Sequence, residues 1–191
     1  MPLTHQDMVL RPMRRRDRDA WSKVRAANFS WLTPWEATAP NAPARPMTFG
    51  QYVHHQRRQA RSDVAHAFVI EVAGELLGQV TIAGIARGSL QSAHVGYWIS
   101  EHVAGRGLMP RAVALAIDYA FTELDLHRVE VNIRPENTAS LRVVQKLGLR
   151  EEGRRLRFLH IQGQWRDHRS FALTREEVDG SLLDRLTPNP G

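Results

Sequence analysis

The chain has no cysteine among its 191 residues. This absence excludes disulfide bonds, a thiolate nucleophile and cysteine-ligated zinc, and it agrees with a reducing compartment, so we expect a cytoplasmic protein. No apolar run approaches the roughly 20 residues that span a bilayer. The N-terminus lacks the basic and apolar segments of a secretory signal. The spacing of histidine and acidic residues suggests no metal site. We therefore expect neither membrane association nor a bound metal.

Acidic residues are fewer than basic ones, 20 against 26, which gives a net charge of +6. A basic surface favours polyanionic partners such as nucleic acid, the ribosome or a phosphate-rich cofactor. The densest basic cluster runs from Arg11 to Arg18 and is interrupted by Asp17, with Asp19 following. This mixture of signs favours a solvated helix entrance over a nucleic-acid patch.

The length of the chain fits one domain covering residues 1–191, with its core in about residues 8–178. Hydrophobic residues make up 42% and charged residues 24%, the balance of an ordinary globular protein. Residues 33–47 contain four prolines and are expected to form an extended loop. Residues 187–191 are expected to be a flexible tail. Neither segment marks a domain boundary.

Apolar periodicity predicts alternating helices and strands along the chain. Thr48 and Asn137 stand at N-cap positions. Helices are predicted over residues 17–28, 48–61, 109–124 and 138–147, with a short one after Thr174, and strands over 9–12, 67–73, 77–83, 93–100, 129–133, 149–161 and 165–173. This order predicts an α/β (α+β) fold with a largely antiparallel central sheet of about seven strands flanked by helices. Gly96, inside a strand, predicts a bulge or a close backbone approach.

The segment Gly105-Arg106-Gly107 follows a predicted strand and opens a helix. Two glycines permit a sharp turn, and the first N–H groups of the helix, together with its dipole, favour an anion. Pro110 fits the first helical turn. The segment is neither a P-loop nor a dinucleotide fingerprint, because the lysine of the first and the third glycine of the second are missing. Taken alone, such a turn is more often structural than ligand-binding.

Several further segments occur around this turn in a characteristic order. They are VGYWISE at 95–101, AIDYAF at 116–121, RPENTASLRVVQKLGL at 134–149, GQWRDH at 163–168 and WLTPW at 31–35. Together with the glycine turn they resemble the GNAT acetyltransferase superfamily, and in particular its ribosomal-protein-alanine N-acetyltransferase branch. The resemblance covers roughly residues 8–178.

The resemblance implies acetyl-CoA as the cofactor. Its pyrophosphate would lie on backbone amides of the turn, which here comprises Ala104, Gly105, Arg106, Gly107, Leu108, Met109 and the adjoining Pro110. Ala104 stands where the superfamily has arginine or glutamine. The strand carrying Tyr97, Trp98 and Ile99 would splay from the strand at 129–133 and leave a slot for the pantetheine arm, which Asn137 would also hold.

The resemblance also suggests catalytic residues. The superfamily often has a tyrosine seven residues after this asparagine, but here the position is Val144. The branch has a serine three residues after it, here Ser140, which would protonate the departing thiolate; the alternative is a small residue in a helix turn. A strand N–H near Tyr97 or Trp98 would polarise the thioester carbonyl. His94 and Glu101 are equal candidates for the general base.

The acceptor side is less defined by sequence. Trp31 and Trp35 would line an acceptor groove or anchor their loop on the core. Asp167 would receive a substrate ammonium or pair with Arg166 or Arg169. We expect direct acetyl transfer to a primary amine, foremost the N-terminal amine of a protein, ribosomal by resemblance.

Several alternatives stay open at this point. The acceptor is alternatively a small amine or a lysine side chain, or the chain is a non-catalytic module that binds CoA or RNA. Contact with nucleic acid is expected only with ribosome association, and the protein is expected to be a monomer or a homodimer.

Overall fold

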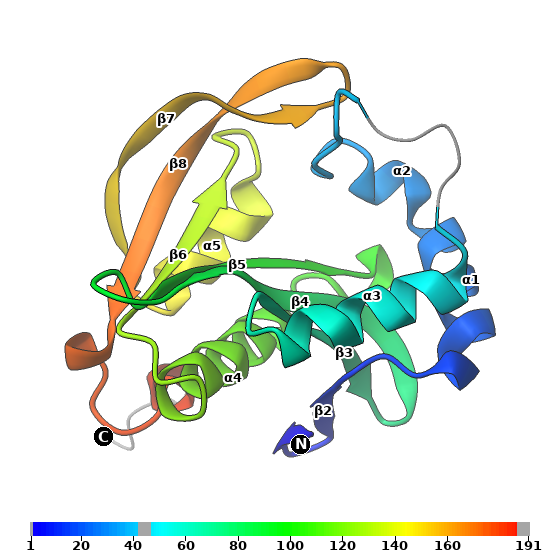
Figure 1. Ribbon diagram of the computed structural model, residues 1–191, viewed down its shortest axis with the longest axis horizontal. Coiled ribbons are helices and arrows are strands. Elements are labelled where there is room, and N and C mark those ends of the chain that lie inside the picture. The colour runs from blue at the N-terminus through cyan, green and yellow to red at the C-terminus, as the bar shows by residue number, and fades with distance from the viewer. Residues whose placement is uncertain (1, 42–46, 187–191) are drawn as a thin grey trace.

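The computed structural model describes residues 2–41 and 47–186. Its frame is one eight-stranded sheet in the order β1-β2-β3-β4-β5-β6-β8-β7 (Figure 1). The strands are β1 Leu3–His5, β2 Met8–Arg11, β3 Ala65–Val72, β4 Glu75–Ala86, β5 Ser92–Ile99, β6 Arg128–Ile133, β7 Arg150–Ile161 and β8 Gln164–Thr174. The mixed, mainly antiparallel sheet confirms the predicted fold class. The strand beyond the seven predicted is the short β1, which pairs with β2.

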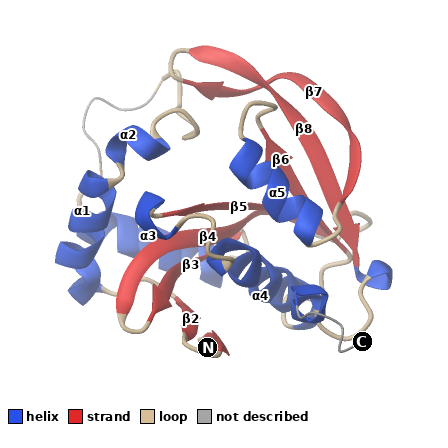
Figure 2. Ribbon diagram, turned by 180° about the vertical axis from the view of Figure 1, so that it is seen from behind, coloured by secondary structure: helices blue, strands red, loops and turns tan. Residues whose placement is uncertain are grey.

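Helices cover both faces of the sheet. They are α1 Arg18–Ala27, α2 Phe29–Leu32, α3 Phe49–Arg61, α4 Leu108–Thr122 and α5 Thr138–Lys146, with shorter 3-10 helices at Arg15–Asp17, Glu101–Val103, Arg175–Glu177 and Leu182–Leu186. Figures 1 and 2 show α3 and α4 on opposite faces, with α5 on the side of α4. Sequence analysis missed α2, which directly follows α1. Within the described residues, no helix is both long and apolar enough to cross a membrane.

Two predicted segments reach beyond what the structure describes. Residues 42–46 of the proline-rich loop and the tail at 187–191 lie outside the described residues. The expectation of a single domain over residues 1–191 stays a prediction.

The larger core lies between α4 and the sheet. Val113, Ala116 and Ile117 of α4 are fully buried and share a cluster with Val80 and Ile82 of β4. These residues recur every three or four positions along the helix, and such spacing places them on one face. A second, smaller cluster under α1 and α3 contains Met13, Val24, Val53, Val69 and Leu76.

The entrance to α1 is solvated, as predicted, at four exposed arginines, but two of its residues are not. The four are Arg14, Arg15, Arg16 and Arg18. Arg11 and Asp17 are buried, with 8% and 7% of their surface exposed, and Arg11 Nη1 donates to Asp17 Oδ2 at 2.7 Å. Arg11 Nε also donates to Glu71 of β3 at 2.7 Å. Burial by itself raises the pKa of Asp17, but hydrogen bonds from Arg11 and from the Arg14 backbone outweigh it and hold the pKa below its usual value. A buried ion pair therefore fixes the start of α1 on the sheet.

The sheet divides where β5 and β6 diverge. The two strands pair in parallel only between Ser92–His94 and Arg128–Glu130. Beyond this point β5 continues beside β4, and β6 continues beside β8. The predicted splay is confirmed, but the predicted bulge at Gly96 is wrong. Pairing of β4 with β5 is regular through Gly96, and the irregularity lies between Ala83 and Ala86.

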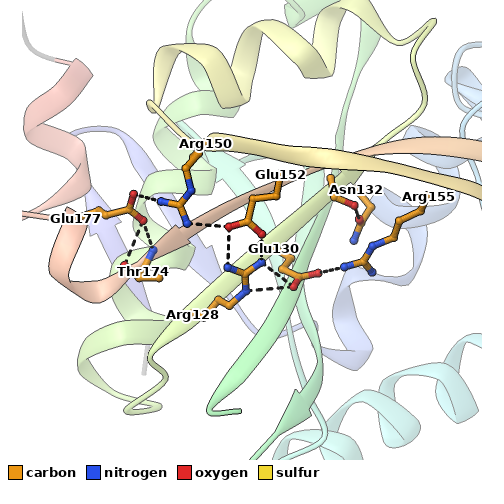
Figure 3. A network of polar contacts seen from close by, with 9 residues as sticks. Arg128, Glu130, Asn132, Arg150, Glu152, Arg155, Thr174 and Glu177 are labelled. Atoms are coloured by element: carbon orange, nitrogen blue, oxygen red, sulfur yellow. Dashed lines mark hydrogen bonds and ion pairs between the residues drawn. The ribbon is translucent and has the colours of Figure 1, made fainter. Parts of the chain in front are cut away.

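An ion-pair network ties β6 to β7 on the far side of the split (Figure 3). Arg128 pairs with Glu130 and with Glu152, and Arg155 Nη2 lies 2.6 Å from Glu130 Oε2. Hydrogen bonds from Arg128 and then Arg150 lower the pKa of Glu152 to about 2. The network ties to β7 the part of β6 that still pairs with β5. The diverging end of β6 is held by its pairing with β8, which continues to Ile133 opposite Arg169.

Candidate active site

A cavity of about 830 Å³ opens at the split between β5 and β6. Five structural pieces line it: the end of β5, the neighbouring stretch of β4, the glycine turn before α4, one side of α5, and α2 with the loop after it. Residues predicted to bind cofactor or acceptor that line it are Trp31, Trp35, Tyr97, Trp98, Ile99, Ala104, Gly105, Gly107, Met109, Pro110, Asn137 and Ser140. The two predicted residues of the turn outside this lining are Arg106 and Leu108.

The glycine turn has the backbone that its sequence requires. Gly105 and Gly107 have φ of +81° and +78°, in the left-handed region that side chains rarely adopt. Gly107 is the N-cap of α4. A glycine supplies no side-chain acceptor for the first N–H groups of its helix, and the helix dipole makes this end positive. The turn thus fits an anionic ligand such as a pyrophosphate.

The start of α5 is held from two directions. Asn137 is its N-cap, as predicted, and its Oδ1 accepts from the Ser140 N–H at 3.0 Å. The Tyr97 hydroxyl of β5 donates to the Ser140 carbonyl oxygen at 3.3 Å. Burial raises the pKa of Tyr97, so this phenol stays protonated and acts as a donor. These contacts connect β5 to α5 across the split and position Ser140 in the cavity wall.

The other end of the cavity is formed by α2 and the loop that follows. The Trp31 indole Nε1 donates to the Ile99 carbonyl oxygen at 3.1 Å, which anchors α2 on the end of β5. The Arg134 guanidinium lies 5.3 Å from the centre of the Trp35 ring, and its Nη1 donates to the Pro34 carbonyl oxygen at 2.7 Å. Trp31 and Trp35 therefore both anchor their segment and line the cavity.

Several lining residues were missed by sequence analysis. They are Leu32, Glu36, Gln79, Thr81, Val103, Glu136, Thr138, Ala139, Arg142, Val143 and Lys146. Gln79 and Thr81 alternate along β4, so the two-residue period of a strand was a usable signal. Arg142 and Lys146 lie one helical turn apart on α5 and add positive charge. Glu36 carried no such signal.

Besides Arg106 and Leu108, three predicted residues lie outside the cavity lining. His94 is exposed, and its ring lies over Gly84, where an added Cβ would meet Nε2 at 2.5 Å. Glu101 is exposed, and its backbone N–H donates to Asn28 Oδ1 at 2.8 Å. Asp167 accepts from Arg154 Nη2 at 2.7 Å, so the predicted partners Arg166 and Arg169 were wrong. The catalytic and substrate roles of these three stay predictions.

Comparisons with known proteins agree with this geometry. The family model described as an acetyltransferase (GNAT) domain matches residues 7–150. The ribosomal protein uS5-alanine N-acetyltransferase of Escherichia coli is 31% identical over 185 residues, 90% of each chain. The structure of Mycobacterium smegmatis RimJ in complex with CoA-disulfide superposes with a TM-score of 0.88 at 38% identity, covering 97% of this chain and 91% of that one.

Relatives with a different acceptor also match. The spermidine N(1)-acetyltransferase of Escherichia coli is 28% identical over 192 residues, covering 98% of this chain and 95% of that protein.

Among the described residues, no cluster of three or more histidine, aspartate or glutamate side chains could hold a metal ion.

Proposed function

Because the chain belongs to the acetyltransferase (GNAT) domain family and is an acetyl-CoA-dependent N-acetyltransferase, we propose that its acceptor is a protein N-terminal α-amine. The observation that carries this proposal is the size of the space at the acceptor end of the cavity, where α2 and β4 line it. The cavity shares Glu36, Gln79, Thr81 and Trp98 with a second hollow. An acceptor much longer than its amine therefore has space to lie along the protein.

The opposite end of the cavity suggests how the cofactor is held. We assign the pyrophosphate to the amides of the turn at residues 104–109 and the pantetheine arm to the slot beside Asn137. Arg142 and Lys146 lie on the α5 wall of the cavity and would add attraction for phosphate. When bound, acetyl-CoA supplies the thioester whose acetyl group is transferred.

The residues of the chain then have separate tasks. A backbone N–H of β5 near Tyr97 or Trp98 donates to the thioester carbonyl oxygen, where negative charge develops. The Ser140 hydroxyl protonates the departing thiolate. Holding the amine and the thioester together in one cavity supplies much of the rate through proximity. The transfer is direct, with no acyl group on the protein.

The general base has two predicted candidates, His94 and Glu101, and neither lines the cavity. Either would act through intervening water. The carboxylates in the lining are Glu36 and Glu136. Comparing pH–rate profiles of His94→Gln, Glu101→Gln and Glu36→Gln separates them: the base is the residue whose removal abolishes the acidic limb of the profile.

A small polyamine is the second candidate acceptor, favoured by the match to the spermidine N(1)-acetyltransferase. A non-catalytic module that binds CoA or RNA is not favoured, because the family is one of transferases. If the acceptor is ribosomal, as for the uS5 relative, the protein acts in the cytoplasm, and that location is part of the proposal.

An acceptor screen tests the proposal. The full chain is incubated with acetyl-CoA and, in turn, with alanine-initiated peptides, N-terminally blocked lysine peptides and spermidine, and thiol release is measured. We expect the highest kcat/KM with the free N-terminal peptides. Preference for spermidine or for blocked lysine peptides contradicts the protein N-terminus as acceptor.

A further inference from the structure

The second hollow lies between α1, α3 and the face of β4 and β5 that points away from α4. Its volume is about 900 Å³. Figures 1 and 2 show α3 lying across this face of the sheet, opposite α4. The side chains that give it its chemistry are Trp21, Arg25, Phe49, Tyr52, Gln79 and Trp98. Of these residues, only Trp98 was predicted from the sequence to bind a ligand, and that ligand was the cofactor.

The hollow adjoins the cavity of about 830 Å³ described above, which is called the transfer cavity from here on. Gln79 and Thr81 of β4, Trp98 of β5 and Glu36 line both. One further residue of an extended chain spans at most about 3.6 Å. We therefore take the second residue of a peptide whose α-amine lies in the cavity to be the one whose side chain meets the walls shared with the hollow.

The walls of the hollow are aromatic. The rings of Trp21 and Tyr52 stack with their centres 5.9 Å apart at 27°, and Trp21 meets Trp98 edge-on at 5.5 Å and 61°. Rings in these arrangements present large, rigid apolar surfaces. Such a surface is suited to a large apolar or aromatic side chain.

The mouth of the hollow already holds a cation, the Arg25 guanidinium. The Arg25 guanidinium lies 5.3 Å from the centre of the Trp98 ring and so occupies the face that would attract a ligand cation. Arg25 also forms a two-pronged pair with Glu36, with Nη2 2.9 Å from Oε2. A second cation would have to displace Arg25 from both partners.

We propose that this hollow is a specificity subsite that binds the side chain of the residue following the acetylated one. It takes a large apolar or aromatic side chain and disfavours lysine, arginine and the second ammonium of a polyamine. This inference rests on the proposed function, because it requires a peptide acceptor.

The test uses alanine-initiated peptides that differ only at the second residue, which is phenylalanine, leucine, glycine or lysine. We measure kcat/KM with the full chain and acetyl-CoA. Burial of a large apolar side chain predicts about a tenfold advantage of phenylalanine and leucine over glycine. Lysine is expected to fall below glycine.

Two variants on α1 locate the effect. Ser22 is exposed and lines the hollow, so Ser22→Trp fills it without disturbing the core. Lys23 is the exposed neighbour outside the lining, and Lys23→Trp is the matched control. The advantage of phenylalanine should disappear in the first variant and persist in the second. Arg25→Met tests the charge: lysine should gain on phenylalanine at least severalfold.

The outcomes separate the inference from the proposed function. Equal kcat/KM for all four peptides, or the same loss in both tryptophan variants, overturns the subsite while N-terminal acetylation stands. A preference for lysine, or an unchanged lysine ratio in Arg25→Met, overturns the assigned chemistry. Acetylation of spermidine but of no peptide overturns the proposed function, and the subsite with it.

Discussion

The two ends of the transfer cavity are built differently. The cofactor end consists of backbone features: a left-handed glycine turn, the start of α4 and a capped start of α5. The acceptor end consists of side chains from α2, β4 and the loop after α2. Contacts from outside the lining hold them, such as Arg25 with Glu36 and Arg134 with Trp35. The first end binds a group common to the family, whereas the second is free to vary with the acceptor.

The largest expected effect is at the start of α1, the helix whose Trp21 and Arg25 line the second hollow. Asp17→Asn leaves the buried Arg11 with Glu71 as its one remaining carboxylate partner among those described. We therefore expect the free energy of unfolding, measured by urea denaturation, to fall by about 3 kcal/mol. At temperatures where the variant is folded, its KM for acetyl-CoA should not change. Asp63→Asn, which breaks an exposed pair with Arg87, is the control and should cost less than about 1 kcal/mol.

This contribution also depends on pH. The pKa of Asp17 is lowered in the folded state, so its stabilisation is fully present above the usual value of 3.8 and is lost as the pH falls through the folded pKa. The difference in stability between the wild type and Asp17→Asn should therefore shrink on acidification below pH 3.8. A difference that stays constant across this range would contradict the assigned charge.

Ser140→Ala tests the chemistry where the two ends meet. Removing a general acid is expected to lower kcat about a hundredfold. KM for acetyl-CoA should change little, because the bond from the Ser140 N–H to Asn137 uses the backbone. Steady-state kinetics checks both numbers, and Ser92→Ala at the opposite end of β5 is the control. Full activity in Ser140→Ala would remove the proposed acid.

Gly107→Ala tests the cofactor end alone. A side chain at φ of +78° costs about 1–2 kcal/mol, so the turn relaxes and KM for acetyl-CoA should rise about tenfold. Gly163, with φ of +77° in the β7–β8 turn, is the matched control. Gly163→Ala should show similar strain by thermal unfolding without the change in KM. Equal kinetics in both variants would mean that the turn does not bind the cofactor.

Asn137→Ala gives the smallest effect. Loss of the N-cap is expected to cost about 1 kcal/mol of stability, with a rise in KM for acetyl-CoA of a few fold. Thr48 caps α3 in the same way, and its hydroxyl accepts from the Gln51 N–H. Thr48→Ala should match the stability loss and leave KM unchanged, and calorimetry with kinetics distinguishes the two. A similar KM in both variants would give Asn137 a capping role only.

The contrast between the two ends also explains what could be predicted. The glycine turn and the caps at Thr48 and Asn137 were predictable because each is specified by residues adjacent in sequence. The fold class was predicted from the order of helices and strands, and the divergence of β5 from β6 was predicted from the resemblance to a family. The proposed bulge at Gly96 was wrong because glycine leaves space in a strand without requiring irregular pairing.

The acceptor end could not be read in the same way. Glu36 and Arg25 are eleven residues apart, on either side of α2, which Trp31 bonds to the end of β5. Asp167 pairs with Arg154 on the neighbouring strand β7 rather than with an arginine close to it in sequence. Cross-strand and interhelix partners depend on register and packing, which a single sequence does not specify.

The most direct test of the account offers one peptide with two amines. A peptide with a free N-terminal alanine, phenylalanine at the second position and an internal lysine is incubated with the full chain and acetyl-CoA. Fragmentation mass spectrometry then locates the acetyl group. The account predicts acetylation of the α-nitrogen, slowed about a hundredfold in Ser140→Ala. Acetylation of the lysine side chain, or of neither amine, would contradict it.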